Sequence, residues 1–132
     1  MSKRPVPTPD VETLPFWEGA QAGRLKIQRC TACSHAIFYP RLVCPACMAE
    51  EPEWIDVLGQ ATIHALTTVH RTGAAFREDV PFAVALVDLA EGPRMMTRVL
   101  SDQPEALRIG DAVQVTFVEQ PEGPPLPFFT PC

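Results

Sequence analysis

Four of the five cysteines of this chain fall in two closely spaced pairs, within the stretch CTACSHAIFYPRLVCPAC. Cys30 and Cys33 form the first pair, Cys44 and Cys47 form the second, and ten residues separate the two pairs. A two-residue spacer lets a tight turn direct both sulfurs to one point, and two such turns supply the four ligands of a tetrahedral metal ion. The spacing therefore predicts a structural metal site.

Disulfides and redox chemistry are the alternatives to a metal site. A thioredoxin-type dithiol needs one pair between a strand and a helix, whereas this chain has two pairs. Tetrahedral thiolate suits both zinc and iron, and zinc is the default for a ribbon within a larger domain. Four cysteines leave no open position for water or substrate, so the predicted ion is structural rather than catalytic. Cys132 is the last residue and is interpreted as a bystander.

Histidines are the next residues that could do chemistry. His35 lies two residues after the first cysteine pair, but it is interpreted as a loop residue because four cysteines already suffice. His64 and His70 lie in ATIHALTTVHRT, whose β-branched content predicts a strand. Their spacing of six places them on one side of that strand, either as a functional pair or as two half-exposed residues.

No catalytic constellation is visible in the sequence. Glu78, Asp79 and Asp88 could include a carboxylate pair, but such residues at strand ends are usually solvated. The chain has no GxSxG, no phosphate-binding glycine loop and no HExxH motif. We therefore predict no catalytic residue, and a self-sufficient thioesterase or hydrolase is disfavoured.

The elements that position the cysteines begin with an arm and a strand. Residues 1–9 hold three prolines and are expected to be extended, and Asp10 could cap a short helix within residues 11–23. Residues 24–30 alternate apolar and polar side chains, which predicts a strand leading into the first cysteine pair. We place the helical arm at residues 1–23 and the ribbon at residues 24–52.

From Trp54 onward the sequence alternates between strands and turns. A long extended run bends at Gly59, and further strands are expected at residues 81–90, 94–100 and 112–119. The proline-rich end offers Leu126, Phe128 and Phe129 for docking onto the barrel. This pattern is typical of a small Greek-key barrel of the OB type, with a β-sandwich as the rival. The predicted fold is mainly β, with an OB-fold domain over residues 53–132.

Composition limits the partners and the location of the protein. The chain has 132 residues, is 46% hydrophobic and carries a formal net charge of −5. It shows no long apolar run and no signal-peptide core, so we expect a soluble, cytoplasmic protein without a membrane partner. The negative charge disfavours a general nucleic-acid binder, which needs clustered lysine and arginine.

Several stretches together resemble a known family. They are PFWEGAQAGRLKIQRCTAC, CPAC, PFAVALVDLAEGPRM and RIGDAVQVTF, and they are similar to the zinc-ribbon-plus-OB-fold proteins associated with acyl-CoA metabolism. The resemblance covers residues 10–129 and implies a helical arm, a rubredoxin-like ribbon and an OB domain. By position it implies that the four paired cysteines are the metal ligands. The family usually has glycine soon after the second cysteine, where Ser34 and His35 stand, and again near Gln60.

The resemblance also implies a function that depends on a partner. Members are typically small subunits of thiolase-like enzymes, including acyl-CoA thiolases and retro-aldolases of side-chain degradation in lipid metabolism. A thiolase-like or lipid-transfer-protein-like large subunit then holds the catalytic groups. We expect a non-catalytic accessory subunit that scaffolds such a complex. Contact with acyl-CoA, homodimerisation and the acyl group itself stay open.

Four arginines are candidates for binding the acyl-CoA phosphates. Arg71 and Arg77 flank the apolar segment Gly73–Phe76, which could line an acyl path, and Arg94 and Arg98 share one face of a predicted strand. Arginine suits phosphate because its planar fork bonds two oxygens at once. The alternative is that these arginines only solubilise the outside of a barrel.

Two further features concern partners. Leu14, Phe16 and Trp17 give the predicted helix an apolar face that packs on the ribbon or, as we expect, on another subunit. The alternative function is that of a nucleic-acid-binding zinc-ribbon/OB-fold protein, which needs a cationic groove and stacking aromatics. Phe82 and Phe117 instead occupy apolar runs typical of a core.

Overall fold

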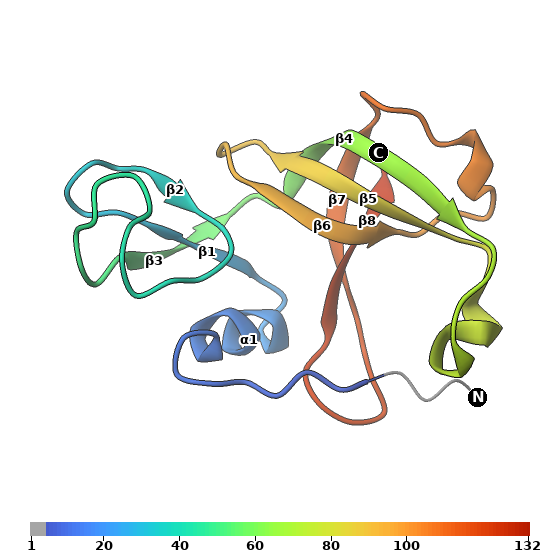
Figure 1. Cartoon of the computed structure of the whole chain (residues 1–132), viewed down its shortest axis with the longest axis horizontal. Helices are drawn as coiled ribbons and strands as arrows, with labels where there is room; N and C mark the ends of the chain where they lie inside the picture. The colour runs from blue at the N-terminus through green and yellow to red at the C-terminus, as the bar shows by residue number, and fades with distance from the viewer. Residues whose placement is uncertain (1–4) are drawn as a thin grey trace.

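The structure is a computed structural model that describes residues 5–132, so the first four residues of the predicted arm lie outside the described part. Figure 1 shows a small ribbon beside a β-barrel, with one short helix packed below the ribbon. This architecture confirms the predicted fold class. Within the described residues no helix is long and apolar enough to span a lipid bilayer.

The helix α1 (Leu14–Gln21) is shorter than the sequence indicated. Asp10 stabilises the turn before it, because its carboxylate Oδ1 accepts hydrogen bonds from the amide and hydroxyl of Thr13, both at 2.9 Å. Proline is tolerated in the first helical turn, where Pro15 lies, because its missing N–H has no intrahelical partner there. The helix buries Phe16 against the rest of the chain.

The ribbon is a three-stranded antiparallel sheet in the order β2-β1-β3. The strand β1 (Leu25–Arg29) lies in the centre, between β2 (Ala36–Ile37) and β3 (Glu53–Val57). The residues of β3 pair with β1 along its whole length, from Leu25–Val57 to Arg29–Glu53. The ribbon sheet therefore extends past residue 52, where we placed the domain boundary.

The barrel is closed and has the strand order β4-β5-β6-β8-β7. Its strands are β4 (Gln60–Val69), β5 (Phe82–Leu89), β6 (Arg94–Val99), β7 (Ala112–Val118) and β8 (Leu126–Pro131). All pairs are antiparallel except β6 with β8, which meet in a parallel bridge at Val99–Phe129. Two 3-10 helices, η1 (Ala74–Asp79) and η2 (Pro104–Ala106), lie between strands.

The core follows from strand alternation. Along β5 every second side chain is buried, and the intervening ones are half-buried. Phe129 of β8 is fully buried, so the proline-rich end supplies a barrel strand as well as a docked side chain. Gly59 separates β3 from β4 with a φ of +77°, and this positive φ lets the chain turn from the ribbon into the barrel.

Candidate metal centre and charged surfaces

The four paired cysteines converge at the end of the ribbon. Their sulfurs all lie within 4.8 Å of one another, with 3.4 Å between Cys30 and Cys47 and 3.7 Å between Cys33 and Cys44. Zn–S bonds of about 2.3 Å at tetrahedral angles need sulfurs about 3.8 Å apart. The donor set therefore fits a tetrahedral metal ion, as the spacing predicted.

The two cysteine pairs lie on two backbone turns of the same type. The amide of Ser34 donates to the carbonyl of Cys30 at 3.0 Å, and the amide of Met48 donates to that of Cys44 at 2.9 Å. Ser34 and Met48 have φ values of 65° and 69°, a region that favours glycine. Ser34 thus adopts the backbone geometry of the glycine that the family usually has after the second cysteine, and Met48 adopts the same geometry in the second turn.

Hydrogen bonds and neighbouring sulfurs shift the pKa values of the ribbon thiols in opposite directions. The amide of Cys33 lowers the pKa of Cys30 to about 6, helped by the amide of Ala32. The amide of Ala49 lowers the pKa of Cys47, but the neighbouring sulfurs of Cys30 and Cys33 outweigh it and raise that pKa to about 12. Four adjacent thiolates repel one another, so full ionisation of the quartet needs a bound cation.

The histidines do not join this cluster or each other. His35 contributes only backbone groups: its carbonyl accepts a 2.9 Å hydrogen bond from the amide of Cys30, and its amide donates to the sulfur of Cys33. His64 lies at a β-bulge in β4, and His70 follows that strand and lies 3.5 Å from Glu105 of η2. The structure therefore does not form the His64–His70 pair that their spacing allowed.

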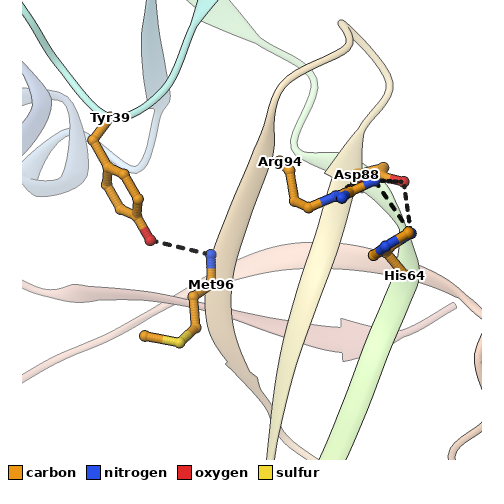
Figure 2. Close-up of polar contacts among 5 residues, drawn as sticks. All are labelled: Tyr39, His64, Asp88, Arg94 and Met96. Atoms are coloured by element: carbon orange, nitrogen blue, oxygen red, sulfur yellow. Dashed lines mark hydrogen bonds and ion pairs between the residues drawn. The ribbon is translucent and has the colours of Figure 1, made fainter.

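His64 belongs to a charged cluster on the outside of the barrel (Figure 2). Arg94 Nε donates to Asp88 Oδ1 at 2.6 Å, and Arg94 Nη2 lies 3.2 Å from His64 Nδ1. The hydrogen bond from Arg94 lowers the pKa of Asp88, and the same bond raises the pKa of Arg94. Sequence reasoning had Arg94 as a phosphate ligand, and the structure gives it two partners within the chain.

Arg98 is enclosed on the same face of β6. Its guanidinium lies 3.2 Å from the carboxylate of Asp79, and the two side chains are only 13% and 14% exposed. The guanidinium carbon sits 3.8 Å from the centre of the Phe82 ring, with Phe128 and Phe76 farther away. Arg98 thereby anchors η1 to the barrel, a role that no sequence pattern indicated.

The remaining candidates have different environments. Arg71 and Arg77 are exposed, and neither forms a salt bridge within residues 5–132. Phe16 is only 7% exposed and packs edge-on against Trp17, with ring centres 4.9 Å apart. Leu14 is 47% exposed, so of the predicted apolar face it alone offers much surface to a partner.

The ribbon and barrel also meet through polar contacts. The hydroxyl of Tyr39 accepts a hydrogen bond from the amide of Met96 at 3.5 Å, which joins the ribbon to β6 (Figure 2). Beside it, a cleft of about 370 Å³ separates residues 35–38 of the ribbon from residues 91–94 of the barrel. No sequence pattern predicted this cleft, because its two walls come from distant segments.

A zinc ribbon joined to an OB barrel is the class of protein that this fold and metal centre define. Family profiles match both parts: residues 17–53 match "ChsH2, rubredoxin-like zinc ribbon domain", and residues 54–118 match "ChsH2, C-terminal OB-fold domain". The chain belongs to this ChsH2, or DUF35, family, which confirms the resemblance seen in the sequence.

Individual relatives extend the comparison. The chain is 31% identical to a probable enoyl-CoA hydratase alpha subunit of Thermomonospora curvata, over 98% of this chain and 40% of that protein. It is 29% identical to a DUF35 domain-containing scaffold protein of Methanothermobacter thermautotrophicus, over 80% of this chain and 81% of the relative. The chain thus spans less than half of the hydratase subunit and most of the scaffold protein.

A solved structure is similar over nearly the full length. A chain of the Ltp2-ChsH2(DUF35) aldolase superposes with a TM-score of 0.85 at 30% identity, covering 95% of this chain and 98% of that chain. The ribbon and barrel described above therefore recur in a solved member of the family.

Proposed function

We propose that this protein is a non-catalytic accessory subunit of an acyl-CoA-processing enzyme. In this proposal a thiolase-like large subunit, of a thiolase or a retro-aldolase, carries the catalytic groups. The full-length similarity to a chain of the Ltp2-ChsH2(DUF35) aldolase is the observation that carries the proposal. The names of the hydratase alpha subunit and the scaffold protein agree with an acyl-CoA-related supporting role.

The side chains of the structure support a non-catalytic role. Within residues 5–132 the polar contacts of His64 are with Asp88 and Arg94, and that of His70 is with Glu105, so neither activates a serine or cysteine. The four ribbon cysteines are grouped as metal ligands. Among residues 5–132 these arrangements leave no serine or cysteine activated by a histidine, a kind of nucleophile that acyl transfer commonly uses.

We propose zinc as the ion of the ribbon, with iron as the alternative. Four sulfur ligands suit both ions, and a closed four-coordinate site is typical of structural zinc. The bound ion would stabilise the ribbon by neutralising the thiolates and linking its two turns. It would take no part in acyl-CoA chemistry.

Direct contact with acyl-CoA is a finer part of the proposal. Arg71, Arg77 and Arg94 are the exposed members of the four candidate arginines, and Arg71 and Arg77 flank the segment Gly73–Phe76 on the η1 loop. Arg94 and Arg98 already bond carboxylates within the chain. We therefore assign any phosphate contact at this loop to Arg71 and Arg77.

The nucleic-acid alternative has less support. A single-strand binder presents aromatic rings for bases to stack on. Here Phe82 lies against the Arg98 guanidinium and Phe117 packs against the core cluster. The chain also carries a net charge of −5.

Affinity purification from the native cell extract tests the proposal. The tagged chain should recover a thiolase-like subunit in near-equal amount, identified by mass spectrometry, and Cys132→Ser should recover the same amount as a control for thiol artefacts. Recovery of nuclease-resistant nucleic acid, with no thiolase-like chain, would instead favour the OB nucleic-acid binder.

A further inference from the structure

The cleft at the ribbon–barrel junction has walls from three parts of the chain. His35 follows the first metal turn, Arg41 precedes the second, and Arg94 begins β6 after the β5–β6 turn. In Figure 1 that turn points from the barrel toward β2 of the ribbon. Two arginines and a histidine thus line one cleft in a chain whose net charge is negative.

Arg41 is held in place before any ligand arrives. The side chain of Gln28, which is 4% exposed, makes two hydrogen bonds with the backbone of Arg41. Gln28 Nε2 donates to the carbonyl of Arg41 at 2.7 Å, and the amide of Arg41 donates to Gln28 Oε1 at 2.6 Å. The Arg41 guanidinium itself makes no hydrogen bond or salt bridge with the residues that the structure describes.

Arg94 is held from the opposite wall. Its Nε and Nη2 bond the two carboxylate oxygens of Asp88 at 2.6 and 3.4 Å, so the plane of the guanidinium is fixed. Its Nη1 makes no hydrogen bond within the described part of the chain and is left for a ligand. A guanidinium has five N–H donors, so binding Asp88 does not exhaust it.

Glu91 is the carboxylate that also lines the cleft. Its Oε2 accepts a hydrogen bond from the amide of Leu58 at 3.3 Å. Its Oε1 is buried, with no partner among the described residues, and so exposes almost no surface to the cleft. The accessible polar groups are therefore mainly those of the arginines and His35.

We propose that this cleft binds a phosphate group. The Arg41 guanidinium, which has no partner among the described residues, and the unbonded Nη1 of Arg94 could donate to different oxygens of one phosphate, and such charge-assisted bonds are strong. A volume of about 370 Å³ exceeds a lone ion and falls in the range of small-molecule sites. The phosphate is either inorganic or part of a coenzyme A headgroup. In the second case the inference deepens the proposed function and rests on it.

Titration of the isolated, metal-loaded full chain tests the site without any partner subunit or turnover. Backbone amide NMR shifts are followed as inorganic phosphate is added, with sodium chloride at equal ionic strength as the blank. A second series uses desulfo-coenzyme A, which lacks a thiol that could compete for the metal. We expect saturable shifts in residues 35–41 and 91–94 with phosphate and none with chloride. Tighter binding of desulfo-coenzyme A at these residues identifies the headgroup source, and equal binding identifies inorganic phosphate.

Variants separate the cleft from general electrostatics. Arg41→Ala should weaken phosphate binding about ten-fold or more, because it removes a charge-assisted bond. Arg41→Lys should bind with intermediate affinity, since it keeps the charge but loses the fork. Arg24→Ala makes the same charge change at a 64% exposed side chain that does not line the cleft, and should stay within about two-fold. Absent or non-saturating shifts in the cleft, or equal losses in Arg24→Ala and Arg41→Ala, would overturn the site.

Discussion

Replacing Arg98 with methionine should loosen the η1 segment and destabilise the barrel. Arg98 and Asp79 form a 3.2 Å ion pair whose side chains are 13% and 14% exposed. The substitution removes the guanidinium, which pairs with Asp79 in a poorly solvated position and lies 3.8 Å from the centre of the Phe82 ring. Methionine keeps a long apolar stem, so most of the packing volume survives.

The size of the effect follows from burial. Breaking a buried pair typically costs 3–5 kcal/mol when the remaining charge is left uncompensated, and Asp79 keeps a further interaction, so we expect a smaller loss of about 2 kcal/mol. For a domain of this length such a loss lowers the Tm by roughly 7 °C. Arg94→Met is the matched control on the same strand, because the Arg94–Asp88 pair is 48% and 39% exposed. Its Tm should change several-fold less.

Thermal unfolding followed by circular dichroism gives the two Tm values, and limited trypsin digestion reports on the segment itself. Cleavage after Arg71 and Arg77 should be faster in Arg98→Met, because η1 loses its anchor to the barrel. Equal Tm changes for the Arg98 and Arg94 variants would refute the anchoring role. The anchoring role would also be refuted if Arg98→Met kept its Tm and digestion rate but lost acyl-CoA binding, because Arg98 would then act as a ligand.

Three further predictions concern the metal site and the backbone. Cys44→Ser should lose the bound metal ion and unfold the ribbon, which metal analysis and amide NMR would detect. Cys132→Ser is the control and should keep the metal. Full metal content in Cys44→Ser would contradict the assigned ligands. Gly59→Ala should lower the free energy of unfolding by about 2–4 kcal/mol in chemical unfolding, because φ is positive there and the new Cβ overlaps a valine of β7. Gly23→Ala is the control, since φ is also positive but the space is open, and it should cost about 1 kcal/mol. Equal losses would show that the overlap at Gly59 is relieved. Met48→Gly should raise the free energy of unfolding by a few tenths to about 1 kcal/mol, since φ is 69° there, and a loss in the same measurement would mean that the exposed methionine side chain stabilises the turn.

The metal centre could be predicted because its information is local. Two residues within each pair and ten residues between pairs fix the geometry of the turns, and the structure brings all four sulfurs within 4.8 Å. The strands β1 and β7 were predicted because half-buried strands alternate in polarity, and β5 because a short apolar run bounded by turn residues is typical of a buried strand, with β6 following it after the turn. The bend at Gly59 was predicted because glycine marks sharp turns.

Features that depend on distant pairing were not predicted. The residues of β3 continue directly into β4 in the sequence, and only their pairing with β1 assigns them to the ribbon sheet. The proline content of residues 121–132 disguised β8, whose prolines have no N–H to donate to the ladder, yet β8 closes the barrel through Phe129. The Arg98 anchor needs a loop nineteen positions away, so an arginine that looked solvent-facing is enclosed.

An acyl-CoA cleavage assay on reconstituted subunits tests the central claim most directly. The thiolase-like subunit recovered with this chain and the chain itself are assayed separately and then mixed at equal concentration, with acyl-CoA loss followed by chromatography. The account predicts turnover in the mixture, little or none from the large subunit, and none from this chain. Turnover by this chain alone, or full activity of the large subunit without it, would contradict the accessory-subunit account.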